Sequence, residues 1–597
     1  MKHLAYLNKF FYKYRWRLLP GILFVIISNV FGVLPGRVIA LAFNLVSENI
    51  SVYLLFAGFD RQAIVYDLLS QSLLFFGLTV LILSLLRGIF LFFMRQTIIL
   101  MSRHIEYDLK NEIYQHYQEL SMSFYRRNNT GDLMNRATED VSRVRMYVGP
   151  AIMYAINTLV LFLLVIIVML NVNVRLTIYS VLPLPILAFT IYYVHNLISD
   201  RSERIQERLS ALSNFVQENF SGIRVIKSYG REEDVREKFA AESEEYKKSS
   251  LSLVQVQALF YPLMLLLIGV STILTVYVGG LEVIRGTITA GNIAEFIVYV
   301  TQLTFPVMSL GWVTSLVQRA AASQKRINEF LHTQPDIISP DTEELQLRGS
   351  IEFRNVTFIY PDTGIKALDN VSFKVNPGEF LAIIGRTGSG KSTIANLLLR
   401  MYDVTEGQIL IDGKPIKDLN LNSYRSQTGF VPQEVFLFSD TIANNIAFSQ
   451  AKIDRAEVEQ AAKDAAVYSN IVEFDKGFET LIGERGITLS GGQKQRISIA
   501  RALIKKPQLL ILDDCLSAID TKTEEEILSN LGRNMHDKTS ILIAHRVSTI
   551  KNADNILVLE EGKIIEEGNH EELMSKKAAY MKLYEKQLLE EQQLESI

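Results

Sequence analysis

Cysteine is nearly absent from this sequence of 597 residues, which contains only Cys515. An intramolecular disulfide needs two cysteines, so a disulfide-stabilised scaffold is excluded. Zinc sites built from four thiolates and iron–sulfur clusters held by cysteines are excluded for the same reason. We therefore expect the water-soluble part of the chain to face a reducing cytoplasm.

A charge excess of either sign is missing as well. The sequence has 61 Lys and Arg against 64 Asp and Glu, a net charge of −3, which gives no support to nucleic acid as a partner. Apolar residues make up 49%, which is too many for a disordered chain. A pure membrane bundle would carry fewer charges, and 597 residues are too many for one hydrophobic core. The composition predicts a membrane part joined to a water-soluble part.

Six apolar runs in the first half predict six transmembrane helices, because about 20 apolar residues span a bilayer. The first run follows a basic N-terminus and is too long for the apolar core of a cleaved signal peptide. We expect the spans at about 18–43, 68–94, 148–170, 176–194, 256–280 and 292–312.

The polar segments between these spans differ in length and charge. Lys and Arg are dense in two long stretches, Arg95–Tyr147 and His195–Val254, and sparse in the short turns after the third and fifth spans. Positive charge favours the cytoplasmic side, so the long stretches and both termini are expected there, on the cell membrane. Both stretches keep helical periodicity, which predicts membrane helices that extend well into the cytoplasm.

The second half changes to alternating strand and helix patterns, which are typical of a nucleotide-binding α/β domain. We therefore divide the chain into a six-helix transmembrane domain (1–324), a polar linker with Pro335 and Pro340 (325–348), an α/β domain (349–577) and a charged C-terminal helix (578–597). A solvated tail is our interpretation of the last segment, with a partner-binding site as the alternative.

A phosphate-binding loop is predicted directly after the apolar strand Phe380–Ile384. The segment Gly385–Ser392 fits G-x-x-x-x-G-K-[ST] between a strand and a helix. Its glycines let backbone N–H groups surround phosphate, Lys391 adds a cation for the β- and γ-phosphates, and Ser392 suits Mg²⁺. The predicted cofactor-binding residues here are Gly385, Arg386, Thr387, Gly388, Ser389, Gly390, Lys391, Ser392 and Thr393.

A second apolar strand, Leu509–Leu512, ends in two carboxylates, Asp513 and Asp514. We expect this strand to lie beside the phosphate strand, where Asp513 would hold Mg²⁺. A capping or turn role is the alternative for an isolated Asp pair, and the apolar run before it disfavours that alternative.

Between these motifs stands Leu489–Gln493 (Leu-Ser-Gly-Gly-Gln), and here the chain resembles the ATP-binding-cassette (ABC) proteins. Further matches are the adenine-stacking Tyr360, Gln433 in Val-Pro-Gln, the loop Gly483–Gly486, the loop Ser517–Asp520, and the γ-phosphate switch residue His545. The first half resembles the six-helix exporter domain of the same superfamily, through Ser123–Tyr125 with Thr130–Arg136 and through Glu218–Lys227.

The resemblance implies a half-transporter exporter that works as a dimer with ATP and Mg²⁺. Ser490, Gly491, Gly492 and Gln493 would contact ATP held by the phosphate loop of a second half-transporter, since they offer N–H groups at a helix start. Ser392, Gln433 and Asp513 would bind the metal, and Asp514, His545 and Gln433 would be catalytic.

Asp514 departs from the family pattern, which usually has Glu after the metal-binding Asp to orient or deprotonate water. Asp is about one methylene shorter, and a misplacement of roughly 1 Å can cost about 10²-fold in rate. The site on this chain should therefore bind ATP and hydrolyse it slowly. This resembles one subunit of bacterial heterodimeric multidrug exporters; a homodimer with two slow sites is the alternative, which the retained His545 supports.

The cargo is specified poorly by the sequence. We expect an amphipathic drug or a lipid as the default cargo. Two alternative functions stay open: a homodimeric lipid flippase, and a nucleotide-gated regulatory membrane protein with little turnover. Arg37 and Arg87 could face an anionic cargo, with snorkelling or interhelical bonding as the alternative. Asn29, Asn157, Tyr299 and Gln302 are polar cavity candidates, for which interhelical hydrogen bonds are the favoured alternative.

Overall fold

The computed structural model describes residues 2–340, 344–483 and 489–595, and the chain forms two compact units. The helical unit comprises Met1–Gln118 and Gly131–Thr333. The cassette unit comprises Glu119–Thr130 and Gln334–Ile597, so a short segment between two long helices belongs to it. This segment contains the one-and-a-half-turn helix α4 (Met122–Arg127).

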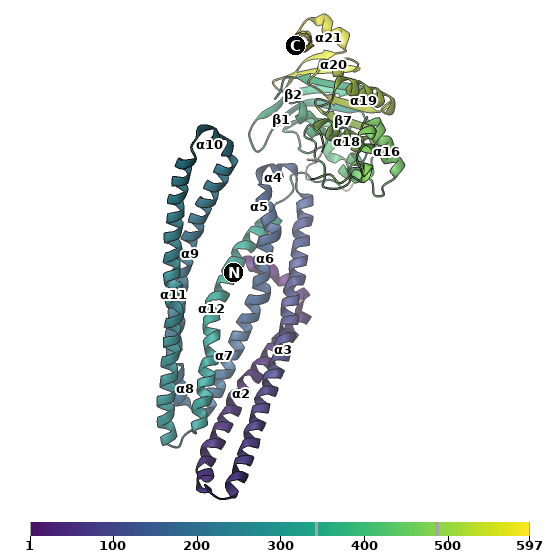
Figure 1. Cartoon of the computed structure of the whole chain (residues 1–597). Coiled ribbons are helices and arrows are strands. Elements are labelled where there is room, and N and C mark those ends of the chain that lie inside the picture. The colour runs from purple at the N-terminus through teal and green to yellow at the C-terminus, as the bar shows by residue number, and fades with distance from the viewer. Residues whose placement is uncertain (1, 341–343, 484–488, 596–597) are drawn as a thin grey trace. The chain divides into compact units, whose positions relative to one another are not determined.

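The helical unit consists of long helices and short helical connections (Figure 1). Within the described residues, six helices are long and apolar enough to cross a membrane, as the sequence predicts. The long helices are α2 (Arg15–Leu55), α3 (Arg61–Glu119), α7 (Ile152–Val172), α9 (Pro183–Ser221), α11 (Glu232–Ile284) and α12 (Ala290–Leu331). The shorter ones include α1 (Asn8–Lys13), α5 (Thr130–Asn135), α6 (Val141–Met146), α8 (Val174–Val181) and α10 (Ile223–Tyr229), and two π-helical turns, Arg136–Asp140 and Tyr147–Ala151, join α5, α6 and α7.

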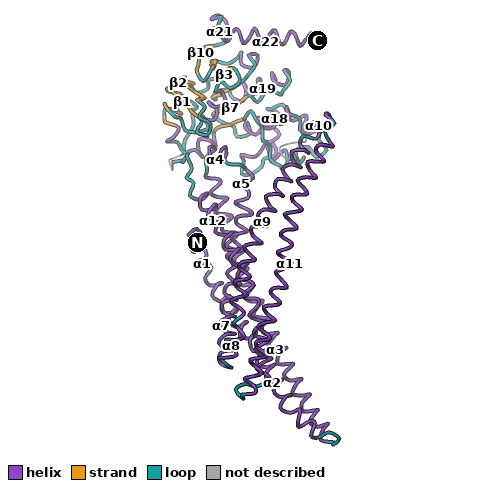
Figure 2. The backbone as a smooth tube through the Cα atoms, turned by 90° about the vertical axis from the view of Figure 1, so that its left-hand side faces the viewer, coloured by secondary structure: helices purple, strands orange, loops and turns teal. Residues whose placement is uncertain are grey.

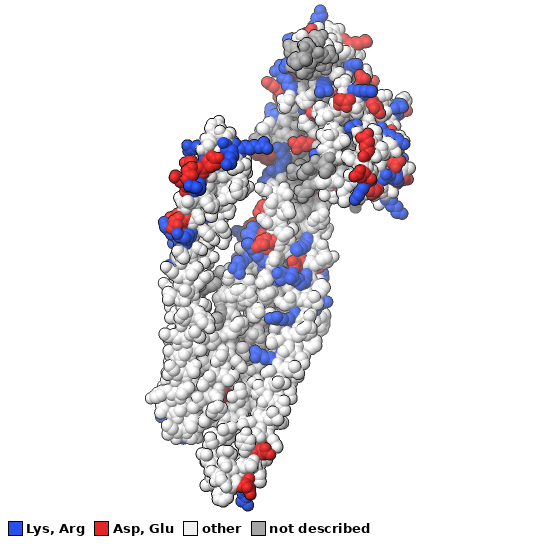
Figure 3. Space-filling model, viewed as in Figure 1, with Lys and Arg blue, Asp and Glu red and all other residues white. Residues whose placement is uncertain are grey.

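Several helices are much longer than a bilayer requires. Helix α3 has 59 residues and α11 has 53, against about 20 for one crossing. Helices α9 and α11 lie side by side over most of their length and are joined through α10, as both views show (Figure 2). Gly230 closes this connection in the left-handed conformation, with φ of 62°. In Figure 3 the lower part of the helical unit is mostly uncharged apart from its tip, and most of the visible charged residues of this unit lie over its upper and middle parts.

Close approach of α2 and α12 depends on glycine at two positions. A Cβ atom on Gly36 would lie 2.6 Å from a ring carbon of Tyr299, and one on Gly291 would lie 2.1 Å from the carbonyl oxygen of Ala40. Small residues at such crossings let membrane helices pack closely where no hydrophobic effect drives them together. The α2–α12 contact is therefore fixed by the sequence at these two glycines.

The cassette unit is built on two sheets. The antiparallel sheet has the order β2-β1-β4-β5, with β1 (Ile351–Ile359), β2 (Lys366–Val375), β4 (Glu406–Ile411) and β5 (Lys414–Pro415). The larger sheet has the order β10-β9-β3-β8-β7-β6, with β3 (Phe380–Gly385), β6 (Thr428–Val431), β7 (Leu509–Asp513), β8 (Thr539–Ile543), β9 (Asn555–Glu560) and β10 (Lys563–Gly568). Its strands are parallel except β10.

Helices cover the larger sheet on both faces. Along β3, Leu381 and Ile383 enter one apolar core, and Ala382 and Ile384 enter the other, as the two-residue period of a strand requires. The helices of this unit are α13 (Lys391–Leu398), α14 (Leu421–Ser426), α15 (Ile442–Ile446), α16 (Arg455–Asp464), α17 (Tyr468–Val472), α18 (Gly491–Leu503), α19 (Thr521–Asn534), α20 (Val547–Ile550), α21 (His570–Lys576) and α22 (Ala579–Glu595).

One expectation about the sheet is wrong. The carboxylate strand β7 does not lie beside the phosphate strand β3, because β8 is inserted between them. In register, Ile543 at the end of β8 pairs with Ile383 on one side and with Asp513 on the other. The sequence does not reveal the insertion, since β8 follows β7 along the chain and only tertiary pairing places it next to β3.

Candidate nucleotide site

The phosphate loop, Gly385–Ser392, connects β3 to α13 and is shaped by glycine. Gly388 and Gly390 have φ of 83° and 100°, a region that side chains strain. A Cβ atom on Gly385 would lie 2.2 Å from the carbonyl oxygen of Leu559, so no other residue fits there. Arg386 and Thr387 are exposed on the loop.

Lys391 lies inside this loop and is bound by it. Its Nζ atom donates to the carbonyl oxygens of Gly385 at 2.8 Å and of Arg386 at 2.9 Å. Burial lowers the pKa of Lys391 below its ordinary value, and the charges of Asp514 and Asp513 oppose that shift. The ammonium group is therefore a desolvated cation, which an anion within reach would stabilise.

Two observations test whether phosphate fits this loop. The Oγ atom of Ser389 is buried and has no hydrogen-bond partner among the described residues, as expected for a donor whose acceptor is a ligand. A Cβ atom on Gly388 would meet nothing within 4 Å, so the outer side of the loop is open. The donors and the open side fit a phosphate chain.

Ser392 and Asp513 meet although they come from different elements. Ser392 Oγ, in the first turn of α13, donates to Asp513 Oδ1, at the end of β7, at 3.0 Å. Burial raises the pKa of Asp513 above its ordinary value; the Asp514 charge adds to the effect, while Ser392 and Lys391 oppose it. A hydroxyl and a desolvated carboxylate are oxygen ligands of the kind that Mg²⁺ binds, so the pair fits that cation.

Two further predicted residues converge on Asp514. Gln433 Nε2 donates to Asp514 Oδ2 at 3.1 Å, and His545 Nε2 lies 3.8 Å from the same oxygen. Asp514 itself has φ of 47°, a left-handed conformation that Asp tolerates better than most residues. The strand ends of β7 and β8 and the loop after β6 thus bring these groups together beside Lys391.

Burial lowers the pKa of His545 below its ordinary value of 6.5, the Lys391 charge lowers it further, and Asp514 opposes both. The imidazole is therefore neutral at pH 7 in this arrangement. A neutral ring can donate one hydrogen bond from the nitrogen that carries the proton, which is the chemistry expected of a residue that contacts a phosphate oxygen.

Tyr360 lies at the edge of the phosphate loop. Its hydroxyl is 3.1 Å from Thr393 Oγ1, so the predicted adenine-stacking ring is tied to α13. The guanidinium of Arg126, on α4, lies 4.6 Å from the centre of the Tyr360 ring, and it also pairs with Asp362 at 3.2 Å. The sequence reasoning missed Arg126; its only signal was the basic pair at the end of a short predicted turn.

The predicted signature segment begins α18. Ser490 caps this helix: its hydroxyl accepts from the Gln493 N–H at 3.2 Å, while Gln493 Oε1 accepts from the Ser490 N–H at 2.9 Å. A Cβ atom on Gly492 would lie 3.0 Å from the carbonyl oxygen of Ala518, so Gly at this position lets the loop after β7 approach closely. Across the described residues, no hydrogen bond or ion pair links the segment to Lys391. The predicted loop residues Glu484, Arg485 and Gly486 lie outside the described residues.

Three of the polar cavity candidates, Asn29, Asn157 and Gln302, bond to neighbouring helices. Asn29 Nδ2 donates to Asn157 Oδ1 at 3.0 Å, and Gln302 Nε2 donates to the carbonyl oxygen of Gly32 at 3.0 Å. Arg87 packs against Gly32, where a Cβ atom would lie 3.1 Å from its Nε atom. These contacts agree with the interhelical alternative for these residues.

Glu295, on α12, is a buried acidic residue that the sequence reasoning missed. Glu295 has no exposed surface; its carboxylate accepts from the Tyr299 hydroxyl at 2.9 Å and the Asn292 amide at 3.0 Å. Arg37 Nη1 lies 3.6 Å from the same carboxylate. Arg37 thus has an acidic partner within the chain, and the signal for it was one Glu inside an apolar run.

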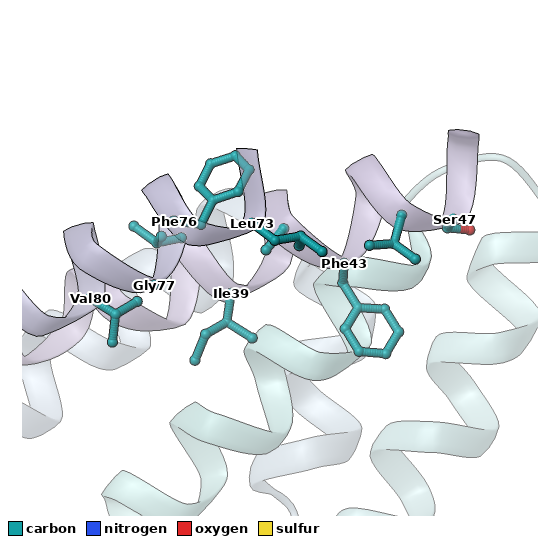
Figure 4. A pocket seen from close by; sticks show the side chains of 10 residues that line it. Ile39, Phe43, Ser47, Leu73, Phe76, Gly77 and Val80 are labelled. Carbon is teal, nitrogen blue, oxygen red and sulfur yellow. The ribbon is translucent and has the colours of Figure 1, made fainter. Parts of the chain in front are cut away.

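A hollow of about 410 Å³ lies between α2 and α3 (Figure 4). Its lining is apolar apart from Ser47, with Phe43 and Phe76 as the largest side chains. Such a surface suits hydrocarbon rather than water.

The fold and the loop together define a P-loop nucleotide-binding cassette joined to a six-helix membrane domain. A family model described as "ABC transporter transmembrane region" matches residues 20–307, and one described as "ABC transporter" matches residues 368–517. The chain belongs to the ABC transporter family, as a half-transporter of the exporter type, and it is a multi-pass membrane protein that binds ATP.

Similar proteins agree with this placement. The chain is 37% identical over 490 residues to "Multidrug resistance-like ATP-binding protein MdlA" of Escherichia coli, covering 82% of this chain and 83% of that protein. It is 36% identical over 524 residues to an "ATP-dependent lipid A-core flippase" of Syntrophus aciditrophicus, covering 87% of each. A solved bacterial Atm1-family ABC exporter with ATP bound matches 96% of this chain and 98% of its own, with a TM-score of 0.74 and 28% identity.

Proposed function

We propose that this protein exports hydrophobic or amphipathic molecules, drugs or lipids, across the cell membrane, driven by ATP hydrolysis in a dimer of half-transporters. The carrying observation is one chain in which six membrane-crossing helices are fused to a site where Lys391, Asp513 and His545 converge. The dense Lys and Arg in the long polar stretches support a cytoplasmic cassette and cytoplasmic termini.

In this proposal the phosphate loop binds ATP and the neighbouring oxygens bind Mg²⁺. Lys391 would exchange its bonds to the Gly385 and Arg386 carbonyls for phosphate oxygens, and Tyr360 would stack on adenine. Ser392 and Asp513, with Gln433 nearby, would hold Mg²⁺, which neutralises charge on the β- and γ-phosphates. Asp514 and His545 would orient water and contact the γ-phosphate.

A second chain is part of this proposal because, within the described residues, the signature segment makes its capping bonds but no bond or ion pair to Lys391 of its own cassette. Ser490–Gln493 exposes the start of α18, whose N–H groups suit an anion. A partner's ATP would supply that anion, and this chain's ATP would meet the partner's segment. Asp514 in place of Glu favours a heterodimer, in which the partner supplies the Glu and this chain's Ser490–Gln493 completes the fast site.

The cargo is proposed from the similar proteins and the apolar hollow. Relatives named for multidrug resistance and for lipid A-core flipping both point to amphipathic molecules. The flippase at 36% identity favours a lipid as the cargo, which is the cargo of the second candidate function, a homodimeric lipid flippase.

The test is a transport assay with the full-length chain reconstituted in vesicles, alone and together with a half-transporter encoded beside it. We expect ATPase activity that rises with some members of a panel of hydrophobic cations, hydrophobic anions and lipids, and ATP-dependent movement of the stimulating molecule. Lys391→Ala serves as the inactive control. ATP binding with neither stimulated hydrolysis nor transport would instead identify a nucleotide-gated regulatory protein.

A further inference from the structure

The C-terminal helix α22 is docked on the cassette unit at its start. Glu566 accepts hydrogen bonds from the backbone N–H groups of Ala579 and Tyr580, which have no acceptor inside the helix. Tyr580 has no exposed surface, and its hydroxyl bonds to His570 at 2.8 Å. The interpretation of residues 578–597 as a solvated tail is therefore wrong for the first turns.

One face of α22 makes the contact. Leu583 and Tyr584 follow Tyr580 by three and four residues and pack against the same apolar core, and Gln587 follows by seven. This spacing places all four on one side of a helix. The first turns therefore hold Gln587 against the cassette.

Gln587 joins both sides of the residue expected to contact the γ-phosphate. Its Nε2 atom donates to the carbonyl oxygen of His545 at 2.6 Å, and its Oε1 atom accepts from the Val547 N–H at 2.8 Å. One side-chain amide thus bonds to the backbone within a three-residue loop, at His545, and to the first residue after it, Val547. The loop runs from the end of β8 to the start of α20.

The neighbouring hydrogen bonds hold the chain on either side of His545 but not at the His545 carbonyl itself. On the β8 side, the Ala544 N–H bonds to the Ile383 carbonyl at 3.1 Å. On the α20 side, the Thr549 hydroxyl bonds to the buried Glu524. Within the described residues, Gln587 alone donates a hydrogen bond to the backbone carbonyl of His545. The ring nitrogen Nε2 of the same histidine lies 3.8 Å from Asp514.

We propose that Gln587 is a positioning residue that fixes the backbone of His545, so that the C-terminal helix takes part in the ATP reaction of the cassette. The inference rests on the proposed function in one respect, the role of His545 at the γ-phosphate. A loss of the amide bridge would let the loop relax and the imidazole drift from its place, and such small displacements reduce rates strongly.

The main experiment measures single-turnover ATP hydrolysis by the full-length chain purified alone, with protein in excess over radiolabelled ATP. Every site then contains this chain's own residues, so a slow rate is as informative as a fast one. Gln587→Met removes both hydrogen bonds and keeps similar volume. We expect a rate lower by about three- to tenfold with ATP affinity within about twofold, because the bridge acts on the reacting position rather than on binding.

A double-mutant comparison separates positioning from general destabilisation. In a His545→Ala background, Gln587→Met should have no further effect on the rate, since the group it positions is gone. Glu585→Ala, at an exposed position of the same helix, is the matched control and should leave the rate unchanged. Thermal unfolding of each variant checks that the cassette remains folded.

The possible outcomes separate the positioning role of Gln587 from the role of His545 in ATP hydrolysis. If His545→Ala lowers the rate and Gln587→Met does not, the positioning role is overturned and the proposed function stands. If Gln587→Met lowers the rate equally in both backgrounds, its effect is only structural and the proposal is also overturned. An unchanged rate in His545→Ala would overturn the role of the histidine itself.

If single-turnover hydrolysis is too slow to measure, an NMR experiment tests the same proposal. The ring signal of His545 in ¹³C-histidine-labelled protein, assigned by its absence in His545→Gln, should shift when a non-hydrolysable ATP analogue binds. Gln587→Met should reduce or broaden that shift, and Glu585→Ala should not. An identical shift in wild type and Gln587→Met would overturn the proposal.

Discussion

Gln433 Nε2 lies 3.1 Å from Asp514 Oδ2, although 81 residues separate them in the chain. The contact shows that the loop after β6 reaches the carboxylate at the end of β7, since these two strands are direct neighbours in the sheet. The short Asp514 side chain is thus within hydrogen-bond reach of Gln433, whereas His545 Nε2 lies 3.8 Å from it. We therefore expect a slow reaction at this site to follow from the reach of Asp514 toward water.

Lys391→Ala should weaken binding of Mg-ATP by about tenfold or more. Lys391 is the cation enclosed by the phosphate loop, and hydrogen bonds to charged groups contribute about 1.5–3 kcal/mol. Equilibrium binding of a fluorescent ATP analogue to the full-length protein measures the change. The control is Lys414→Ala, an exposed lysine on β5. Equal affinities for the two variants would contradict the assignment.

Tyr360→Ala should weaken nucleotide binding by about 1–3 kcal/mol, the usual contribution of stacking on a base. Tyr360→Phe keeps the ring and loses only the hydroxyl contact with Thr393, so it should bind almost as wild type does. Competition between ATP and inorganic triphosphate separates the two contributions, because triphosphate has no base. A loss of triphosphate binding as large as the loss of ATP binding would show that the ring acts on the loop rather than on adenine.

His545 should remain neutral when the pH of the nucleotide-free protein is lowered through 6.5. Burial and the Lys391 charge hold its pKa below that ordinary value, so protonation occurs only at lower pH. The unfolded chain takes up this proton near pH 6.5 and the folded chain does not, so the free energy of unfolding should fall as the pH drops below 6.5.

The measurement for His545 is an NMR titration of histidine-labelled protein, with the signal assigned by His545→Gln. Lys391→Met should move the midpoint upward, because it removes a positive charge beside the ring. A midpoint at or above 6.5 in wild type, or no movement in Lys391→Met, would contradict the arrangement.

Much of the fold could be predicted because its signals are local. Long apolar runs predict the membrane helices, and the loop Gly385–Ser392 has a spacing that only one backbone geometry serves. The insertion of β8 between β3 and β7 could not be predicted, because strand order depends on pairing between segments far apart in the chain. Ser392, at the start of α13, nevertheless lies within hydrogen-bond distance of Asp513, because α13 reaches across to the end of β7.

The residues missed share a different cause. Arg126, Glu295 and Gln587 each make a contact to a residue far away in the sequence, and no sequence motif marks any of the three. For Gln587 the sequence offers one weak indication, its position seven residues after Tyr580 on the same helix face. The many charged residues of this segment favoured a solvated tail instead. One aromatic residue per helical turn, as at Tyr580 and Tyr584, predicts a helix face that packs against the domain.

Asp514→Glu should raise the ATP turnover of this chain purified alone by about tenfold or more. The longer side chain extends the carboxylate by one methylene toward the position of the attacking water, and displacements of roughly 1 Å change rates by about 10²-fold. Steady-state phosphate release measures the turnover, and Asp514→Asn is the control, because it keeps the size and removes the base. When the chain is purified with a half-transporter encoded beside it, the complex with wild-type Asp514 should already turn over fast, because the partner's own site would carry a Glu and this chain's Ser490–Gln493 would complete it. Fast, cargo-stimulated turnover by the wild-type chain alone, not raised by Asp514→Glu, would show that Asp514 serves as a full catalytic base and would favour the homodimer.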